Sequence, residues 1–455
     1  MDASDIEALV IDRPEDGVFK VHADVYRSEE IFELELKHIF EGGWVFIGLD
    51  CQAPKPHDFF TAWIGRQPVI VSRDGDGTLH GLINACRHRG SLICHTAAGN
   101  ARTHVCPYHG WTYDSAGNNT AVTGRDHGAY GAGFDAEEHD LRRIPRFSGY
   151  RGFLFGSLNP DVPPLDDYLG ETRLFIDLVV DQGPDGLETI PGTVHYTYEG
   201  NWKLQIENSA DLYHFMPTHE TLVKIFNART ANDRASDSPY RGRIQRDVTR
   251  GSMCFPNGHN VMFGGGDKIE ARPLYRDLEN LRQRVGEPRL SWMFHTRNVL
   301  YFPNMQLLEN ASLQIRVNRP LSADRTDIVT YCVAPKGESD EARELRIRQY
   351  EEFFNPSGLA TPDDTSIFED IQHATRGGIV DWNQGYMRGM SAVSRGPIGE
   401  ARELGLNPTT SILGSLGLGD ETILQGPIRE WRDRLAAALR GERRSLPQQG
   451  AAAAE

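Results

Sequence analysis

The 455-residue chain is poor in cysteine and has no long apolar run. Its six cysteines are too few for a disulfide framework. A membrane-spanning helix needs roughly 18 consecutive apolar residues, and the sequence has no such run. Residues 1–5 lack the basic region and apolar core of a secretory signal. These absences predict a soluble cytoplasmic protein.

Positive charge is also scarce. The chain has 48 Lys and Arg against 64 Asp and Glu, which gives a net charge of −16. A surface this acidic argues against nucleic acid or an anionic membrane as a partner. The hydrophobic fraction of 39% and the charged fraction of 25% are typical of globular domains, and the length suggests more than one domain.

The pattern of apolar residues changes along the chain. Residues 28–40 predict a helix, whereas residues 43–160 have the alternation and the glycine-bearing turns of an all-β unit. Beyond a proline-rich stretch at 160–164, predicted strands are followed by helices, including one over 202–215. We therefore expect an α+β protein with helices on an antiparallel sheet in its larger domain. Its parts would be an N-terminal helical segment (1–42) packing on that domain, the all-β domain (43–160), the larger domain (161–445) and a disordered tail (446–455).

Two short motifs in the all-β domain combine cysteine with histidine. Cys86-x-His88 is followed, after 17 residues, by Cys106-x2-His109. In a cluster of two irons, two thiolates suit one iron and two imidazoles suit the other. The spacing therefore indicates an iron–sulfur cluster with two irons, with Cys86 and Cys106 on one iron and His88 and His109 on the other. A zinc site with the same four donors is the alternative, although zinc sites usually pair like ligands at short spacing.

A second group of candidate ligands lies near the predicted helix 202–215. Asp211 and His214 are three residues apart and would share one helix face. His219 is five residues beyond His214, and Pro217 would break the helix between the two histidines. Two imidazoles need one carboxylate to complete the facial triad of mononuclear non-haem Fe(II).

Asp364 is the candidate for that carboxylate. Its local sequence, Thr361-Pro362-Asp363-Asp364, also fits a helix start in which Thr361 and Asp364 form a variant capping box. On local chemistry alone, the cap is the favoured interpretation.

Together the motifs resemble the large (α) subunit of Rieske-type aromatic-ring-hydroxylating dioxygenases over nearly the whole chain. Several stretches are similar to the benzoate, toluate, anthranilate and halobenzoate branch. The residues that carry the resemblance are the paired Cys/His motifs continued by Gly110-Trp111, the segments 200–203 and 207–214, and the stretches 40–44, 65–68, 152–160 and 348–355.

The resemblance implies roles for individual residues. Cys86, His88, Cys106 and His109 match the cluster ligands, which makes residues 43–160 the Rieske domain. His214, His219 and Asp364 match the ligands of the mononuclear iron in a catalytic domain over residues 161–445, so the family pattern overrides the cap at Asp364. Asp211 matches the acidic residue that links a cluster histidine of one subunit to an iron-binding histidine of its neighbour. The roles of Glu207 and Asn208 stay open.

The resemblance also implies an activity and partners. A separate NADH-dependent reductase would supply electrons, and the oxygenase would use O2 to cis-dihydroxylate an aromatic carboxylate of the benzoate type at its 1,2-position. An ortho amino or halogen group would then leave with carbon dioxide, yielding catechol. A small β subunit in an α3β3 assembly is expected. No arginine or lysine can be named from the sequence as the partner of the substrate carboxylate.

Two alternatives use the same residues. A Rieske-type monooxygenase or demethylase acting on an aromatic acid would have identical metal ligands. A zinc-stabilised binding protein without redox activity is the alternative from another class of protein.

Overall fold

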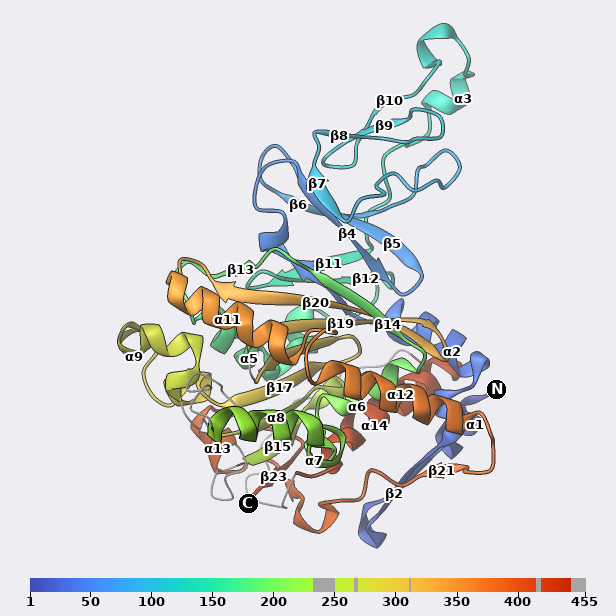
Figure 1. Cartoon of the computed structure of the whole chain (residues 1–455). Helices are drawn as coiled ribbons and strands as arrows, with labels where there is room; N and C mark the ends of the chain where they lie inside the picture. The colour runs from blue at the N-terminus through green and yellow to red at the C-terminus, as the bar shows by residue number, and fades with distance from the viewer. Residues whose placement is uncertain (232–249, 266–268, 311, 415–418, 443–455) are drawn as a thin grey trace, which may run out of the picture. The chain divides into compact units, whose positions relative to one another are not determined.

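The computed structural model describes residues 1–231, 250–265, 269–310, 312–414 and 419–442 (Figure 1). The tail expected to be disordered, 446–455, lies outside these residues. The chain divides into two units. We call Leu36–Leu165 the small unit, and Met1–Glu35 together with Asp166–Glu455 the large unit. Within the described residues, no helix combines the length and the apolar character needed to span a membrane.

The small unit consists of short antiparallel strands in three sheets. Its glycine-bearing turns and alternating apolar residues explain this all-β structure. The sheets, in spatial order, are β11–β12–β3 (Arg146–Tyr150, Phe153–Ser157, Val45–Leu49), β6–β5–β4–β7 (Leu79–Ile83, Gln67–Arg73, Asp58–Ile64, Ala98–Asn100) and β10–β9–β8 (Asn119–Ala121, Thr112–Asp114, Thr103–Val105).

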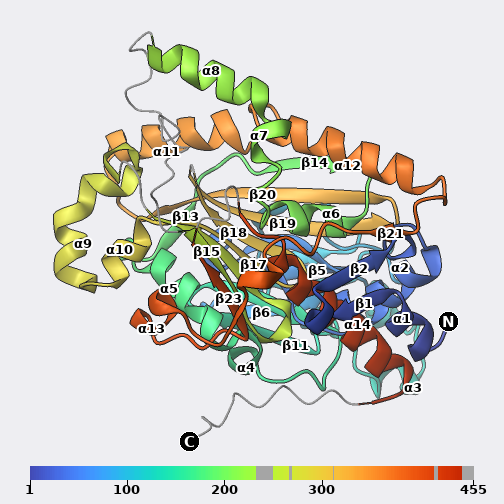
Figure 2. The same ribbon diagram turned by 90° about the horizontal axis from the view of Figure 1, so that it is seen from below.

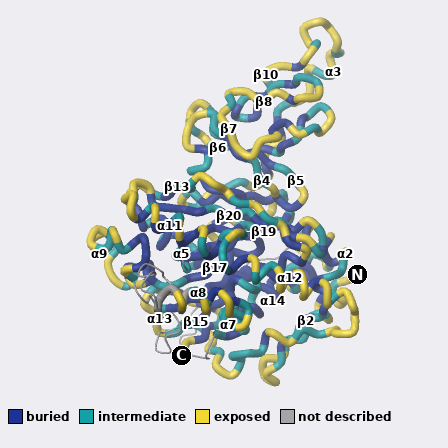
Figure 3. The backbone as a smooth tube through the Cα atoms, in the orientation of Figure 1, coloured by how far each residue is buried: buried dark blue, intermediate teal, exposed yellow. Residues whose placement is uncertain are grey.

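The large unit is built on an antiparallel sheet of ten described strands. Its strands are mostly dark blue, and therefore buried, in Figure 3. In spatial order they are β13 (Leu187–Thr189), β20 (Arg325–Pro335), β19 (Leu313–Ser322), β18 (Met305–Glu309), β17 (Thr296–Tyr301), β16 (Asn260–Gly264), β15 (Arg250–Cys254), β23 (Thr410–Leu413) and β22 (Ser394–Arg395), with β14 (Val194–Tyr198) paired to β20.

Helices of the large unit cover this sheet (Figure 2). Those that carry or adjoin the candidate site are α6 (Trp202–Asn208), α7 (Phe215–Thr218), α8 (Glu220–Ala231), α11 (Asp340–Phe353) and α12 (Thr361–Thr375). The other α-helices in the described residues are α1 (Ala3–Ala8), α2 (Glu29–Glu35), α3 (Ala132–Asp135), α4 (Leu165–Leu169), α5 (Arg173–Val180), α9 (Leu278–Val285), α10 (Arg289–Met293), α13 (Gly399–Glu403) and α14 (Gln425–Leu439).

One face of the sheet packs against α6 and α11. The Gln306 amide on β18 donates to the Gln205 carbonyl of α6 at 2.9 Å, and the Tyr350 hydroxyl of α11 lies 2.6 Å from that of Thr330 on β20. Side chains alternate between the faces of a strand, so Arg316 on β19, which pairs with Gln306 and Thr330, lies on this same face.

The helix predicted over 202–215 is wrong in its length, because α6 ends at Asn208. The next residues, Ser209 to Asp211, include short polar side chains that compete for backbone hydrogen bonds. The break predicted at Pro217 is also misplaced. Pro217 lies inside α7, where the first turn of a helix tolerates proline.

Candidate metal centres

The two Cys/His motifs of the small unit form loops of the same design. In each loop the cysteine N–H donates to the carbonyl five residues later, from Cys86 to Ser91 and from Cys106 to Trp111, both at 2.8 Å. The glycine four residues after each cysteine donates back to the cysteine carbonyl. These glycines have φ values of 76° and 72°, which a residue with a side chain rarely adopts.

The loops bring their imidazoles together. His88 Nδ1 and His109 Nδ1 lie 3.1 Å apart, and the His88 ring stacks on Trp111 with centroids 5.1 Å apart. One metal ion about 2.1 Å from each nitrogen fits this separation. The thiols of Cys86 and Cys106 are buried, with 3% and 2% exposure. The donor set therefore fits a cluster with imidazoles on one metal and thiolates on the other.

A tyrosine hydroxyl also reaches the sulfur side of this site. Tyr113 Oη, from β9, lies 3.3 Å from Cys86 Sγ and accepts a hydrogen bond from the Arg87 N–H. Burial raises the pKa of the Cys86 thiol, while the contact with Tyr113 lowers it. The nearby Cys94 is a buried core residue, and it contacts His104, which is also buried.

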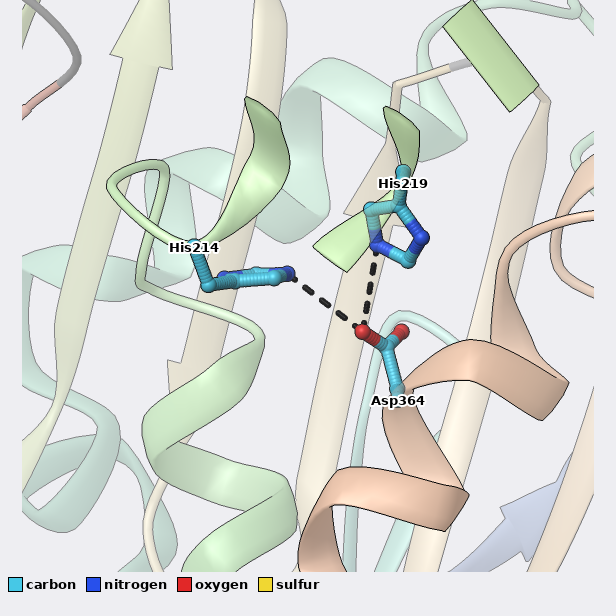
Figure 4. Close-up of side chains that lie close together, drawn as sticks. All are labelled: His214, His219 and Asp364. Atoms are coloured by element: carbon cyan, nitrogen blue, oxygen red, sulfur yellow. Dashed lines mark ion pairs between the residues drawn. The ribbon is translucent and has the colours of Figure 1, made fainter. Parts of the chain in front are cut away.

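The large unit brings His214, His219 and Asp364 together (Figure 4). Asp364 Oδ1 lies 3.4 Å from His214 Nε2 and 3.1 Å from His219 Nε2. The histidines are the residues immediately before and after the four-residue helix α7, which explains how a spacing of five places both rings beside one carboxylate. One ligand atom from each residue can be chosen so that all three lie within 4.8 Å of one another.

Asp364 does not take part in a capping box. Helix α12 starts at Thr361, its N-cap residue Ala360 makes no side-chain cap, and the Thr361 hydroxyl donates to the Phe354 carbonyl at 2.9 Å. The locally favoured interpretation of Asp364 as a cap is therefore wrong.

Two further carboxylates lie at the outer nitrogens of these imidazoles. Asp211 Oδ2 lies 3.2 Å from His214 Nδ1, and Asp363 Oδ2 lies 3.2 Å from His219 Nδ1. Such partners fix the ring orientation and the tautomer, leaving both Nε2 atoms to face a metal. Asp363 was not among the site residues predicted from the sequence, although its position beside Asp364 was a signal. Asp211 and His214 do not share a helix face, because both precede α7.

The charges of the triad stabilise one another without a metal. Burial lowers the pKa of His214, but Asp211 and Asp364 more than offset this and raise it to about 9. Burial raises the pKa of Asp364, yet the two histidines hold it well below its usual range. A metal cation would take the place of the imidazole proton, which is how metal binding couples to protonation.

The sequence left the roles of Asn208 and Glu207 open. In the structure, Asn208 contacts the triad, whereas Glu207 contacts two tyrosines. The Asn208 amide nitrogen lies 3.1 Å from His214 Nε2 and donates to Asp364 Oδ1 at 3.1 Å. Glu207 accepts hydrogen bonds from the hydroxyls of Tyr26 at 2.6 Å and Tyr386 at 3.2 Å. Burial raises the pKa of Glu207 to about 7, and the hydrogen bonds of the two phenols oppose that rise.

A cavity of about 530 Å³ opens beside the triad. Glu207, Asn208, Asp211, His214 and Asp364 all line it. Two candidate ligands, His214 and Asp364, therefore face the same cavity as the acidic residues Glu207 and Asp211. The apolar side chains that line it include Ile367, Phe368, Ile371 and Val380.

The paired Cys/His loops and the two-histidine, one-carboxylate triad together define the class of Rieske non-haem iron oxygenases. Two family models match the chain and agree with this class. They are "Rieske [2Fe-2S] domain" over residues 43–129 and "Ring hydroxylating alpha subunit (catalytic domain)" over residues 189–406. A zinc-stabilised binding protein is accordingly not favoured.

The chain belongs to the family of ring-hydroxylating dioxygenase α subunits. It is 38% identical over 444 residues to the toluate 1,2-dioxygenase subunit alpha of Pseudomonas putida, covering 97% of this chain and 96% of that one. It is 38% identical over 442 residues to the 2-halobenzoate 1,2-dioxygenase large subunit of Burkholderia cepacia, covering 96% and 94%. Among solved structures, naphthalene 1,2-dioxygenase from Rhodococcus sp. bound to indole is similar, with a TM-score of 0.78, 25% identity and coverage of 92% and 94%. The cofactors of this family are a Rieske [2Fe–2S] cluster and a mononuclear iron.

Proposed function

We propose that this chain is the catalytic α subunit of an oxygenase that cis-dihydroxylates an aromatic carboxylate at its 1,2-position. The relatives at 38% identity are named for toluate and 2-halobenzoate, which are both aromatic carboxylates. In the balanced reaction, the ring gains both atoms of O2, and NADH with one proton supplies the two electrons and two protons of the diol. The triad with its adjoining cavity is the observation that carries the proposal.

The residue assignments are part of this proposal. Cys86 and Cys106 would hold one iron of the cluster, and His88 and His109 the other. His214, His219 and Asp364 would hold the mononuclear iron, with sites open for O2. Bound there, the cluster would supply single electrons, and the mononuclear iron would activate O2.

The chain's own residues prepare this site. Asp211 and Asp363 hold the two imidazoles so that their Nε2 atoms face Asp364. The Asn208 amide nitrogen also donates a hydrogen bond to Asp364 Oδ1. His219 is 2% exposed and Asp364 13% exposed, whereas His214 is 22% exposed and borders the cavity. The triad is therefore ordered before a metal or substrate arrives.

We further propose that Asp211 links the triad to His109 of a neighbouring copy in a head-to-tail ring. Three apolar residues that line the cavity are exposed in the single chain: Ile367 (43%), Ile371 (38%) and Val380 (69%). Tyr108, beside His109 in the cluster loop, is 58% exposed. Exposed apolar side chains at both candidate contact regions support such an interface.

Membership of this family implies that the chain has partner proteins. The relatives are subunits of multicomponent dioxygenases, so this chain works with other components such as a reductase. We propose that the reductase uses NADH and that a small β subunit completes an α3β3 assembly. The division into a segment 1–42, a Rieske domain 43–160 and a catalytic domain 161–445 is likewise our proposal, supported by the small unit's range of Leu36–Leu165.

The test is turnover with isotopically labelled O2. The purified oxygenase, with its β subunit and a matching reductase, is supplied with NADH and a panel of benzoates. We expect a cis-diol that carries two labelled oxygens. A single labelled oxygen would instead indicate a monooxygenase, and no turnover of any aromatic acid would contradict the choice of substrate class.

A further inference from the structure

Among the described residues, Arg316 is a buried cation without an anionic partner. It lies on β19 with 3% exposure, and its Nε has no hydrogen-bond partner. In the part of the chain that the structure describes, no carboxylate forms an ion pair with it. Burying an unpaired charge is costly unless something compensates it. The position of Arg316 therefore needs an explanation.

Three other buried cations of the large unit have such compensation. Arg346 binds Glu338, with Nη2 2.8 Å from Oε2, and Arg297 binds Glu309. Lys203 binds Glu35. The protein thus pairs these buried charges with carboxylates of its own. Arg316 differs in that its compensating anion is not among the described residues.

The described neighbours that Arg316 contacts or acts on are neutral side chains. Its guanidinium lies over the Phe354 ring, 5.6 Å from the centroid. Its charge acts on the phenols of Tyr196 and Tyr350, whose pKa values are raised mainly by burial and lowered in part by Arg316. Gln314, two residues earlier on the same face of β19, is fully buried and neither of its amide atoms has a partner. Unsatisfied buried polar groups of this kind indicate a place for a polar ligand.

This neighbourhood adjoins the triad. Phe354 belongs to an apolar cluster with Leu222, Leu308, Phe353 and Ala360, against which Phe215 packs. Phe215 directly follows His214, and its ring lies 5.4 Å from that of His219. The Tyr196 phenol is acted on by the charges of both Arg316 and Asp364. Helices α11 and α12, which precede Phe354 and carry Asp364, lie along the same side of the sheet in Figures 1 and 2.

We infer that Arg316 binds the carboxylate of the aromatic substrate. The inference rests on the proposed function and names its specificity-determining residue. In a 1,2-dihydroxylation, the carbon that bears the carboxylate is one of the two attacked, so the cation that holds the carboxylate must lie near the metal. A guanidinium suits this role because it binds a carboxylate through two parallel hydrogen bonds.

The test compares the binding of benzoate with that of its neutral isostere, benzamide. Both ligands are titrated calorimetrically into the anaerobic holoenzyme of the wild type, R316M and R316K. R346M is the matched control, because it removes a buried guanidinium that is already paired. We expect R316M to weaken benzoate binding roughly 100-fold while leaving benzamide nearly unchanged. R316K keeps the charge but loses the bidentate geometry, so we expect a loss of roughly tenfold.

Thermal unfolding separates binding from folding. R316M removes an uncompensated charge and should unfold at or above the wild-type temperature, whereas R346M should unfold earlier and keep the wild-type ratio of benzoate to benzamide affinity. If R316M does not fold, the affinity of R316K for benzoate and benzamide is used in its place.

The inference is overturned if folded R316 variants bind benzoate within twofold of the wild type. If such variants also oxidise benzoates normally, the inference about Arg316 fails while the proposed function stands. If benzoate binding depends on Arg316 but no aromatic acid is turned over, the proposed function fails while the binding site stands. A wild type that does not bind benzoate contradicts both.

Discussion

The two candidate metal centres differ in how the chain assembles them. In the small unit, each loop supplies one thiol and one imidazole within four residues, and hydrogen bonds inside the loop fix its shape. In the large unit, His214 and His219 flank one short helix, while Asp364 comes from a helix far along the chain. The first centre therefore depends on local turns, and the second depends on the packing of helices against the large sheet.

This difference predicts that the two centres can be lost independently. The largest effect should come from Asp364→Asn, which removes the charged ligand of the triad. We expect turnover to fall by roughly three orders of magnitude, because a bound metal stabilises charge by several kcal/mol. The visible absorption of the cluster should not change. Asp370→Asn, on the exposed side of α12, is the control, and loss of cluster absorption in D364N would contradict independent assembly.

Asp363 and Asp211, the carboxylates beside the outer nitrogens of the two histidines, give a second prediction for the large unit. Asp363→Asn should lower the affinity for the mononuclear iron by about 10- to 100-fold, as expected when a partner of a ligating histidine is lost. Asp211→Asn should lower the iron affinity to a similar extent, because Asp211 holds His214 as Asp363 holds His219. If Asp211 also connects the centres, electron transfer from the reduced cluster should slow by roughly 100-fold in iron-loaded D211N but not in iron-loaded D363N. Iron content and single-turnover kinetics measure the two effects, and equally fast electron transfer in both iron-loaded variants would argue against a linking role for Asp211.

The raised pKa of Glu207 predicts that the stability of the large unit depends on pH. Its pKa of about 7 lies above the ordinary value of 4.5, so the folded state holds its proton more tightly than the unfolded state. Stability should therefore fall as pH rises from about 4.5 to about 7, by at most about 3 kcal/mol. Glu207→Gln should remove this component, measured as the difference in unfolding free energy from the wild type across that range. An unchanged pH profile in E207Q, with the exposed Glu344→Gln as control, would contradict it.

The smallest effect should be confined to the small unit. Tyr113→Phe removes the hydroxyl that lies 3.3 Å from Cys86 Sγ. Hydrogen bonds to cluster sulfurs stabilise the reduced state, so the reduction potential should fall by some tens of millivolts. Redox titration of the cluster measures the shift, with Tyr130→Phe as the control. A potential unchanged in Y113F would mean that the hydroxyl does not donate to the sulfur.

The same difference between the units explains what the sequence could predict. The Cys/His motifs are contiguous, so their spacing alone indicated two facing loops, and the all-β character of the small unit followed from its turns. The association of Asp364 with two histidines could not be deduced locally, because its neighbours equally suited a helix cap. Only the family resemblance named it, and the fold then brought the three residues together.

Other features depended on tertiary structure that no local pattern encodes. The helix α7 between the two histidines has only four residues, which is too short to give a helical pattern in the sequence, so only the folded chain reveals it. Arg316 appears in the sequence as one polar residue among several alternating along a strand. Its isolation from carboxylates becomes visible only when neighbouring strands and helices are in place.

One chain is expected to hold two iron centres of different kinds. Mössbauer spectroscopy of the ⁵⁷Fe-enriched, anaerobically purified oxygenase, combined with sulfide analysis, distinguishes them. We expect about three irons and two acid-labile sulfides per α chain, with one sulfur-ligated and one nitrogen-ligated cluster iron and a separate high-spin Fe(II) signal. A protein that contains zinc and no acid-labile sulfide would contradict the account.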